Sequence, residues 1–209
     1  MYKRIVFDLD GTLIDLVDFR KSVIESLNHF NLTYTEAELN NYMEAMKDYE
    51  EFYRRYDLIY YYNHLKRRSG INFDFDFIEY YLRNYKAFIP ETVDQSVYET
   101  LEYLKSKYDL VVLTNFFRKT QIGRLRELNM DHYFSQVIGA EIHSKPDIHI
   151  FHEAANPFSV DDCLMIGDSY EKDYNAALNA GMDAILVSSD ERYKNENKIR
   201  KIQELRKIL

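Results

Sequence analysis

The stretch RIVFDLDGTL, residues 4–13, decides the fold. Its first part, Arg4–Phe7, is a short run of the kind typical of a strand buried on both faces of a parallel sheet. Two carboxylates, Asp8 and Asp10, follow directly. Because residues two apart on a strand share a face, both are predicted to point the same way at the carboxyl end of this strand. Gly11 would allow the chain to turn sharply there.

Four further runs recur along the chain, with helical patterns between them. They are Leu110–Leu113, Gln136–Gly139, Cys163–Ile166 and Ala184–Val187. Alternating strands and helices are typical of an α/β fold in which helices cover both faces of a parallel sheet. We therefore expect a Rossmann-like core with a sheet of five parallel strands. A last amphipathic helix is expected from Asn197 onward, since isoleucine or leucine recurs there at every third position.

Residues 15–89 break this rhythm. They lack a strand pattern of that kind, and their apolar residues recur at helical spacing. We therefore interpret them as an α-helical domain inserted into an α/β core made of residues 1–14 and 90–209. The insert is rich in aromatic residues, and the whole chain has 19 Tyr and 13 Phe but no Trp. These rings could fill the core of the insert, or they could stack on nucleobases.

Polar residues follow two of the other runs and stand before a later helix. Thr114 and Asn115 follow the second run, and such groups can hydrogen-bond phosphate oxygens. Lys145 precedes a proline suited to a helix start, and it offers a compact positive charge. Asp168 follows the fourth run. Since the carboxyl ends of parallel strands meet at one edge of a sheet, Asp168 would join the two aspartates of the first strand.

Three converging carboxylates favour a hard divalent cation. Mg²⁺ fits best, because it takes oxygen ligands and keeps several waters. Asp173, one turn beyond Asp168, could hold a metal-bound water or Lys145. Each element alone has a simpler interpretation: a turn with solvated carboxylates, a helix N-cap or a surface lysine.

Taken together and in this order, these motifs resemble those of the haloacid dehalogenase superfamily, in its magnesium-dependent phosphatase branch. The resemblance extends over essentially the whole chain, and the helical insert looks like the cap domain of that family. It implies that Asp8 is the nucleophile, which forms an aspartyl-phosphate, and that Asp10 is first the general acid and then the general base. It also implies that Mg²⁺ is bound by the Asp8 carboxylate, the Asp10 backbone carbonyl and the Asp168 carboxylate.

The resemblance further implies that Thr114, the Asn115 backbone and Lys145 hold the phosphoryl oxygens. Many relatives have a small residue after Thr-Asn, where this chain has Phe116, and this difference leaves the shape of the leaving-group side open. Arg20, near the start of the insert, could contact a substrate anion.

Three other functions are weighed against a phosphatase. True dehalogenases of the superfamily lack the second aspartate, so Asp10 argues for phosphate esters. A phosphomutase or phosphotransferase would pass the phosphoryl group to a second hydroxyl. A non-catalytic binding protein on this fold is expected to have lost one or more of Asp8, Asp10, Lys145 and Asp168, and this chain has all four.

Composition narrows the class of protein. The formal net charge is −8, so the chain lacks the excess of basic residues that is expected of a general nucleic-acid binder. The first apolar run is too short for a signal peptide, and apolar stretches do not reach membrane-spanning length. One cysteine, Cys163, excludes a disulfide framework within the chain. We therefore expect a soluble cytoplasmic monomer or homodimer that acts on a small-molecule phosphomonoester.

Overall fold

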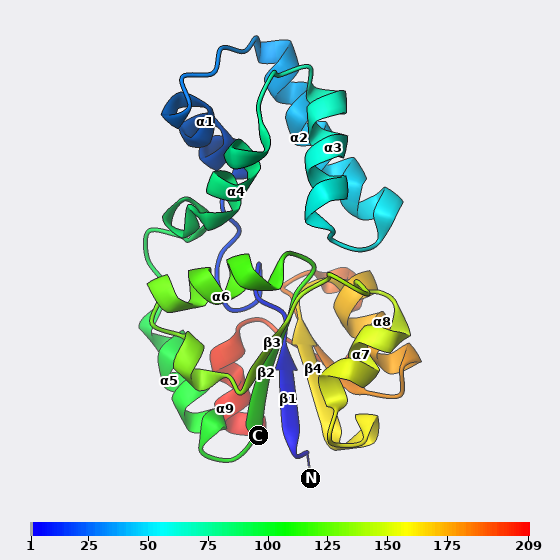
Figure 1. Ribbon diagram of the computed structural model, residues 1–209. Coiled ribbons are helices and arrows are strands. Elements are labelled where there is room, and N and C mark those ends of the chain that lie inside the picture. The colour runs from blue at the N-terminus through cyan, green and yellow to red at the C-terminus, as the bar shows by residue number, and fades with distance from the viewer. Residues whose placement is uncertain (1) are drawn as a thin grey trace.

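The larger lobe of the molecule is built on one parallel sheet. The computed structural model describes residues 2–209 and shows two lobes (Figure 1). Six strands pair in the order β3-β2-β1-β4-β5-β6, and every neighbouring pair is parallel. The strands are β1 (Arg4–Phe7), β2 (Asp109–Leu113), β3 (Gln136–Ile138), β4 (Cys163–Gly167), β5 (Asp183–Val187) and β6 (Lys198–Ile199). The predicted α/β class and the five expected strands are confirmed.

The sixth strand corrects the prediction at the C-terminus, where one continuous helix was expected. The segment instead forms β6, a 3₁₀ turn η6 (Ile202–Glu204) and a short helix α9 (Leu205–Ile208). Ile199, Ile202 and Leu205 are nevertheless all buried in the core of the larger lobe. The apolar spacing thus identified three buried residues, whereas Ile208, the last residue of the pattern, is exposed. Three successive short elements bury the three residues, so the prediction of one helix is wrong.

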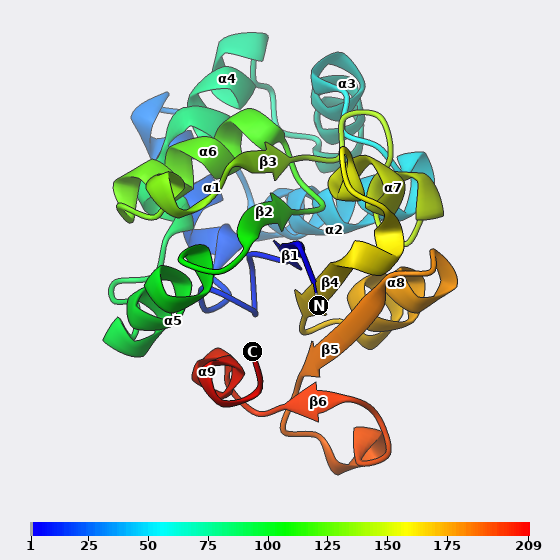
Figure 2. The same ribbon diagram turned by 90° about the horizontal axis from the view of Figure 1, so that it is seen from below.

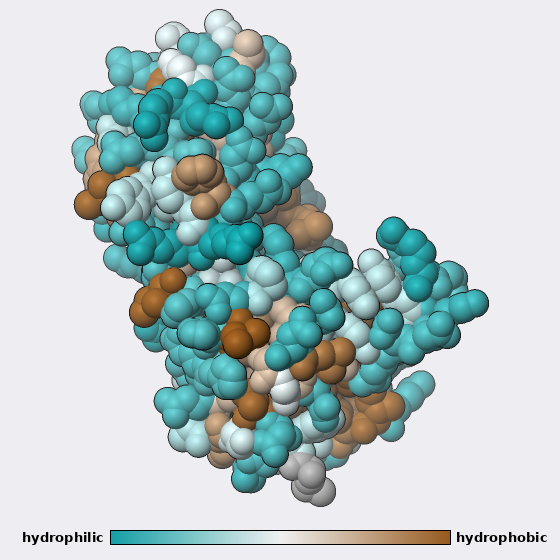
Figure 3. Space-filling view, turned by 90° about the vertical axis from the view of Figure 1, so that its right-hand side faces the viewer, coloured by the Kyte–Doolittle hydropathy of each residue, from teal (hydrophilic) through white to brown (hydrophobic). Residues whose placement is uncertain are grey.

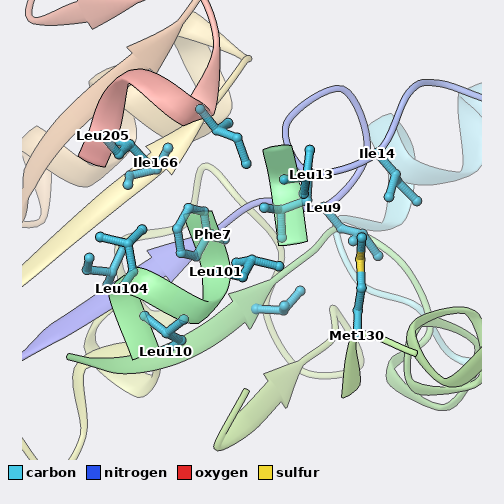
Figure 4. Packing of buried hydrophobic residues seen from close by; sticks show 14 of the residues in the cluster. Phe7, Leu9, Leu13, Ile14, Leu101, Leu104, Leu110, Met130, Ile166 and Leu205 are labelled. Atoms are coloured by element: carbon cyan, nitrogen blue, oxygen red, sulfur yellow. The ribbon is translucent and has the colours of Figure 1, made fainter. Parts of the chain in front are cut away.

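Helices cover both faces of the sheet (Figure 2). Helices α5 (Gln95–Lys105), α6 (Arg118–Glu127) and α9 lie on one side, and α7 (Ile148–Ala155) and α8 (Ala176–Asn179) lie on the other. Alternate residues of β1 divide between the two layers: Phe7 packs in one cluster with Leu101 of α5 (Figure 4), and Val6 in another with Phe151 of α7. This two-sided burial explains the uninterrupted apolar runs.

The smaller lobe lies between β1 and α5 in the chain. It contains α1 (Phe19–His29), α2 (Glu36–Tyr53), α3 (Leu58–Ser69), α4 (Phe75–Arg83) and a 3₁₀ helix η1 (Tyr85–Phe88). Its apolar cluster is largely aromatic: Tyr42, Tyr81 and Phe77 are buried, and the rings of Tyr42 and Phe73 lie 5.9 Å apart, edge to face. Many of the aromatic residues of the insert therefore form its own core.

Direct contacts join the two lobes. The Tyr56 amide donates to the Ala140 carbonyl at 2.6 Å, and the Ser144 hydroxyl donates to the Arg54 carbonyl at 2.9 Å. The loop after α2 is thereby fixed to the loop after β3. Figure 3 shows the lobes from the side, with a narrower waist between them and a mostly hydrophilic surface. Among residues 2–209, no helix is both long and apolar enough to span a membrane.

Candidate active site

A buried lysine joins two carboxylates at the carboxyl edge of the sheet. Asp8 leaves β1, and Asp173 lies in a short π-helix, η4 (Tyr170–Asn175), that follows β4. Lys145 Nζ donates to Asp8 Oδ1 at 2.6 Å and to Asp173 Oδ1 at 2.5 Å. The Ser169 amide donates to the other oxygen of Asp173 at 3.0 Å. Asp173 therefore orients the lysine, which is one of the two roles considered for it.

The electrostatics of this cluster leave negative charge unbalanced. Burial raises the pKa of Asp8 to about 7, the carboxylates of Asp173 and Asp10 add to this, and Lys145 opposes it. Burial alone would lower the pKa of Lys145, but Asp173 and Asp8 outweigh it and the pKa is raised. The pKa of Asp168 is raised by burial and by Asp173. One ammonium thus faces three carboxylates, which favours an added cation.

The oxygen atoms are placed to receive such a cation. One carboxylate oxygen from each of Asp8, Asp168 and Asp173 lies within 4.8 Å of the others. Gly11 has a φ of +87°, and a Cβ there would lie 2.5 Å from Asp168 Oδ2, so only glycine lets the two chain segments approach this closely. Hard oxygen donors of this kind fit Mg²⁺. Lys145 and the Ser169 amide together engage both oxygens of Asp173, whereas Lys145 contacts only Oδ1 of Asp8, so Asp8 and Asp168 are the better candidates for ligands.

Asp10 binds a different partner from Asp8, although both line the same cleft. Arg124 of α6 grips the Asp10 carboxylate with two nitrogens, at 2.7 Å to Oδ2 and 2.5 Å to Oδ1. The Arg124 side chain is only 1% exposed, and its Nε donates to the Phe88 carbonyl at 2.7 Å. A bidentate pair of this kind fixes the plane of the carboxylate as well as its position.

Gln121 extends this pair to the second strand. Its Nε2 donates to Thr114 Oγ1 at 2.7 Å and to Asp10 Oδ2 at 3.2 Å. Sequence reasoning missed Gln121 and Arg124. They lie three residues apart on one face of α6, and both are buried. The available signal was that α6 is strongly polar but buries one face. This signal does not identify the residues that the buried face contacts.

Asn115 holds the backbone of Lys145. Its Oδ1 accepts from the Lys145 amide and its Nδ2 donates to the Lys145 carbonyl, both at 2.8 Å. The same Nδ2 donates to Glu50 of α2 at 2.8 Å, and Lys172 donates to Glu50 at 2.6 Å. The sequence predicted that Asn115 binds phosphate oxygens, through its amide side chain or its backbone, but both ends of the side-chain amide are already engaged by Lys145 and Glu50. The structure adds a role for its side chain, which connects the lysine loop to the smaller lobe.

The structure brings most of the predicted site residues to one cleft of about 460 Å³ between the lobes. Those in its wall are Asp8, Asp10, Thr114, Asn115, Lys145, Asp168 and Asp173. Arg20 is not among the residues in this wall. Its guanidinium pairs with Glu36 and donates to Asn40 Oδ1 at 2.8 Å on the flank of the smaller lobe, so its placement does not support contact with a substrate.

Comparison with known proteins agrees with this arrangement. Residues 5–187 match the family described as haloacid dehalogenase-like hydrolase. The chain belongs to this family. It is 28% identical over 200 residues to the glyceraldehyde 3-phosphate phosphatase of Methanothermobacter thermautotrophicus, an alignment that covers 91% of this chain and 87% of the relative.

Two solved structures of the family share its fold over their whole length. The magnesium-bound HAD-hydrolase YfnB from Bacillus subtilis has a TM-score of 0.71 at 23% identity, covering 100% of this chain and 98% of the other. The 2-haloacid dehalogenase from Pseudomonas syringae pv. Tomato DC3000 has a TM-score of 0.72 at 21% identity, with the same coverage. At these identities the likeness establishes the fold, and the chemistry depends on the site itself.

Proposed function

We propose that this hydrolase is a Mg²⁺-dependent phosphatase that cleaves small phosphomonoesters through an aspartyl-phosphate on Asp8. In this proposal, residues 1–14 and 90–209 form the catalytic core, and residues 15–89 form a cap that covers the substrate. The observation that carries it is a second carboxylate, Asp10, fixed in the same cleft as Asp8. The phosphatase relative, which aligns over 91% of the chain, supports the same class of reaction.

In the first step, one oxygen of Asp8 attacks phosphorus, and the bond to the ester oxygen breaks. Lys145 orients the Asp8 carboxylate by its contact with Oδ1 and supplies positive charge for the phosphoryl oxygens. Bound Mg²⁺ would neutralise the charge of the attacking carboxylate and of the phosphate, with Asp8, Asp168 and the Asp10 backbone carbonyl as ligands. The Thr114 hydroxyl, fixed by Gln121, would donate to a phosphoryl oxygen.

Asp10 transfers protons in both steps. As the acid it protonates the departing ester oxygen, and as the base it removes a proton from the water that hydrolyses the aspartyl-phosphate. Arg124 and Gln121 hold its carboxylate in the cleft. The oxygen that carries the proton would release its contact with Arg124 or Gln121, because a carboxyl O–H donates instead of accepting. Its loss should therefore matter more for an alkyl ester, whose leaving oxygen needs a proton, than for an activated aryl phosphate.

The test is phosphate release from p-nitrophenyl phosphate with Mg²⁺ or with a chelator. Wild type should release phosphate only with Mg²⁺, and Asp8→Asn should release none while keeping its circular dichroism spectrum. Substantial turnover by Asp8→Asn would refute the assignment of the nucleophile. Asp10→Asn should lose more activity on an alkyl than on an aryl phosphate, and equal losses would count against its role as the acid.

Release of free phosphate also separates hydrolysis from phosphoryl transfer. A phosphotransferase would convert a sugar phosphate to an isomer or to a second phosphorylated product without release. If wild type releases no phosphate, binding of beryllium fluoride with Mg²⁺ would still distinguish a working Asp8 from a silent site, since this complex mimics the aspartyl-phosphate.

A further inference from the structure

The wall of the cleft that faces the catalytic carboxylates is mostly apolar. One face of α2 points toward the site through Met43, Met46, Lys47 and Glu50, which are spaced as positions i, i+3, i+4 and i+7 of a helix. The neighbouring stripe of α2, which includes Tyr42, is buried in the core of the smaller lobe, and Met43 and Met46 pack against the edge of the same cluster. The face toward the site therefore borders that core and is only partly buried by it.

Aromatic and aliphatic residues from other segments complete this wall. Phe19 begins α1, Leu16 lies just before it, and Phe116 follows Asn115 in the larger lobe. The Phe116 ring packs edge to face against Tyr56 at 5.3 Å. Phe116, which departs from the pattern of many relatives, thus forms part of an aromatic surface on the leaving-group side.

Few polar groups remain on this side to bind a polar leaving group. The Glu50 carboxylate is occupied by Lys172 and by Asn115. Within the described residues, Lys47 has no hydrogen bond or ion pair to the protein, and it lies exposed at the rim. Hydroxyl groups of a sugar would lose their hydrogen bonds to water against methionine and phenylalanine, and each group left unpaired in this way weakens binding.

Building on the proposed phosphatase activity, we propose that the preferred substrates are phosphomonoesters of apolar alcohols, aromatic or aliphatic, and not polyhydroxylated sugar phosphates. The catalytic edge binds the phosphoryl group, and the wall of Phe19, Met43, Met46 and Phe116 binds the leaving group. Methionine side chains are flexible and polarisable, so this wall accepts several apolar shapes. A cleft of about 460 Å³ has room for a phosphate and one ring or a short chain.

The test compares four esters of primary alcohols, so that polarity varies more than the chemistry of the leaving oxygen. These are 2-phenylethyl phosphate, hexyl phosphate, glucose 6-phosphate and glycerol 3-phosphate, each assayed for phosphate release with Mg²⁺. We expect kcat/KM to be at least tenfold higher for the two apolar esters, because apolar pocket contacts typically discriminate by tenfold or more.

Variants of Met43 test whether the wall causes this preference. Met43→Gln should reduce the ratio of kcat/KM for the apolar esters to kcat/KM for the sugar ester at least fivefold. Met43→Leu should keep this ratio high. The pair of variants separates an effect of side-chain polarity from an effect of lost folding. Ile59→Gln is the matched control, since Ile59 is 63% exposed on α3 and outside the cleft. It should leave all four rates unchanged.

Three results would contradict the inference in different ways. Equal or faster hydrolysis of glucose 6-phosphate or glycerol 3-phosphate would refute the substrate class and leave the phosphatase intact. Absence of release from all four esters and from p-nitrophenyl phosphate would refute the phosphatase, and the substrate class with it. An unchanged ratio in Met43→Gln would show that α2 does not select the leaving group.

Discussion

Replacement of Asp8, the proposed nucleophile, should stabilise the metal-free protein while it abolishes turnover. Asp8 is buried beside Asp173, and burial raises its pKa from 3.8 to about 7. Because the pKa is higher in the folded than in the unfolded chain, the folded protein binds the proton more tightly. The stability linked to this proton is present below about pH 4 and is lost as the pH rises through about 7.

The size of the effect follows from the same shift. A rise in pKa from 3.8 to about 7 corresponds to roughly 4 kcal/mol of ionisation free energy. Asp8→Asn removes that penalty, but an amide accepts a weaker hydrogen bond from Lys145 than a carboxylate does. We therefore expect the free energy of unfolding at pH 8 in chelator to increase by about 2 to 3 kcal/mol. At pH 4.5 the gain should be small.

The assay is urea unfolding followed by circular dichroism at several pH values between 4.5 and 8, always with chelator. Asp74→Asn is the matched control, because its carboxylate is 94% exposed and pairs with Lys66 only at 3.5 Å. Its effect should stay within about 0.5 kcal/mol at every pH. A loss of stability in Asp8→Asn at pH 8, or a gain of the same size at pH 4.5, would refute the reasoning.

Three further predictions concern the metal and the contacts around the site. Mg²⁺ at a hundred times its Kd should stabilise wild type by about 2.7 kcal/mol in thermal unfolding, and Asp168→Asn should lose most of this stabilisation. An equal stabilisation of wild type and Asp168→Asn would exclude Asp168 as a ligand. Arg124→Met should lower kcat tenfold or more for alkyl phosphates with little change in KM, because Asp10 loses its bidentate partner; an unchanged kcat would show that Asp10 does not need it. Glu50→Gln should raise KM severalfold. It should alter the free energy of unfolding by less than about 1 kcal/mol, since the side chain of its partner Lys172 is 46% exposed. Steady-state kinetics measures the KM and urea unfolding the stability, and an unchanged KM would contradict the prediction.

Much of the core could be predicted because the sheet imposes a simple pattern on the sequence. A parallel strand buried on both faces is mostly apolar, and the predicted run Arg4–Phe7, apolar from Ile5 onward, coincides with β1. The carboxyl ends of such strands meet at one edge, so residues directly after them must lie close together. Asp168 directly follows β4, and one of its carboxylate oxygens lies within 4.8 Å of one from Asp8 for this reason.

Contacts that depend on how helices pack across the sheet could not be predicted. Arg124 reaches Asp10 from 114 positions away, through the placement of α6 beside η1 and the end of β1. Local spacing on α6 does not reveal what its buried face meets. Arg20 shows the opposite error, in which a residue is predicted at the site but does not line it. It follows the site residues of β1 closely in the sequence, but its guanidinium pairs with Glu36 and Asn40.

Helix α2 connects the proposed binding of the leaving group with the placement of Lys145, the proposed catalytic lysine. Its methionines form part of the wall against the leaving group, and Glu50 at the end of the same face accepts a hydrogen bond from Asn115. Asn115 in turn holds both backbone polar groups of Lys145, whose ammonium orients Asp8. In the proposed mechanism, a leaving group that packs against the methionines would contact the same helix face that carries Glu50, and it would thereby favour the contact between Glu50 and Asn115. Binding energy from the non-reacting part of the substrate can then be used to order the nucleophile, which raises kcat as well as lowering KM.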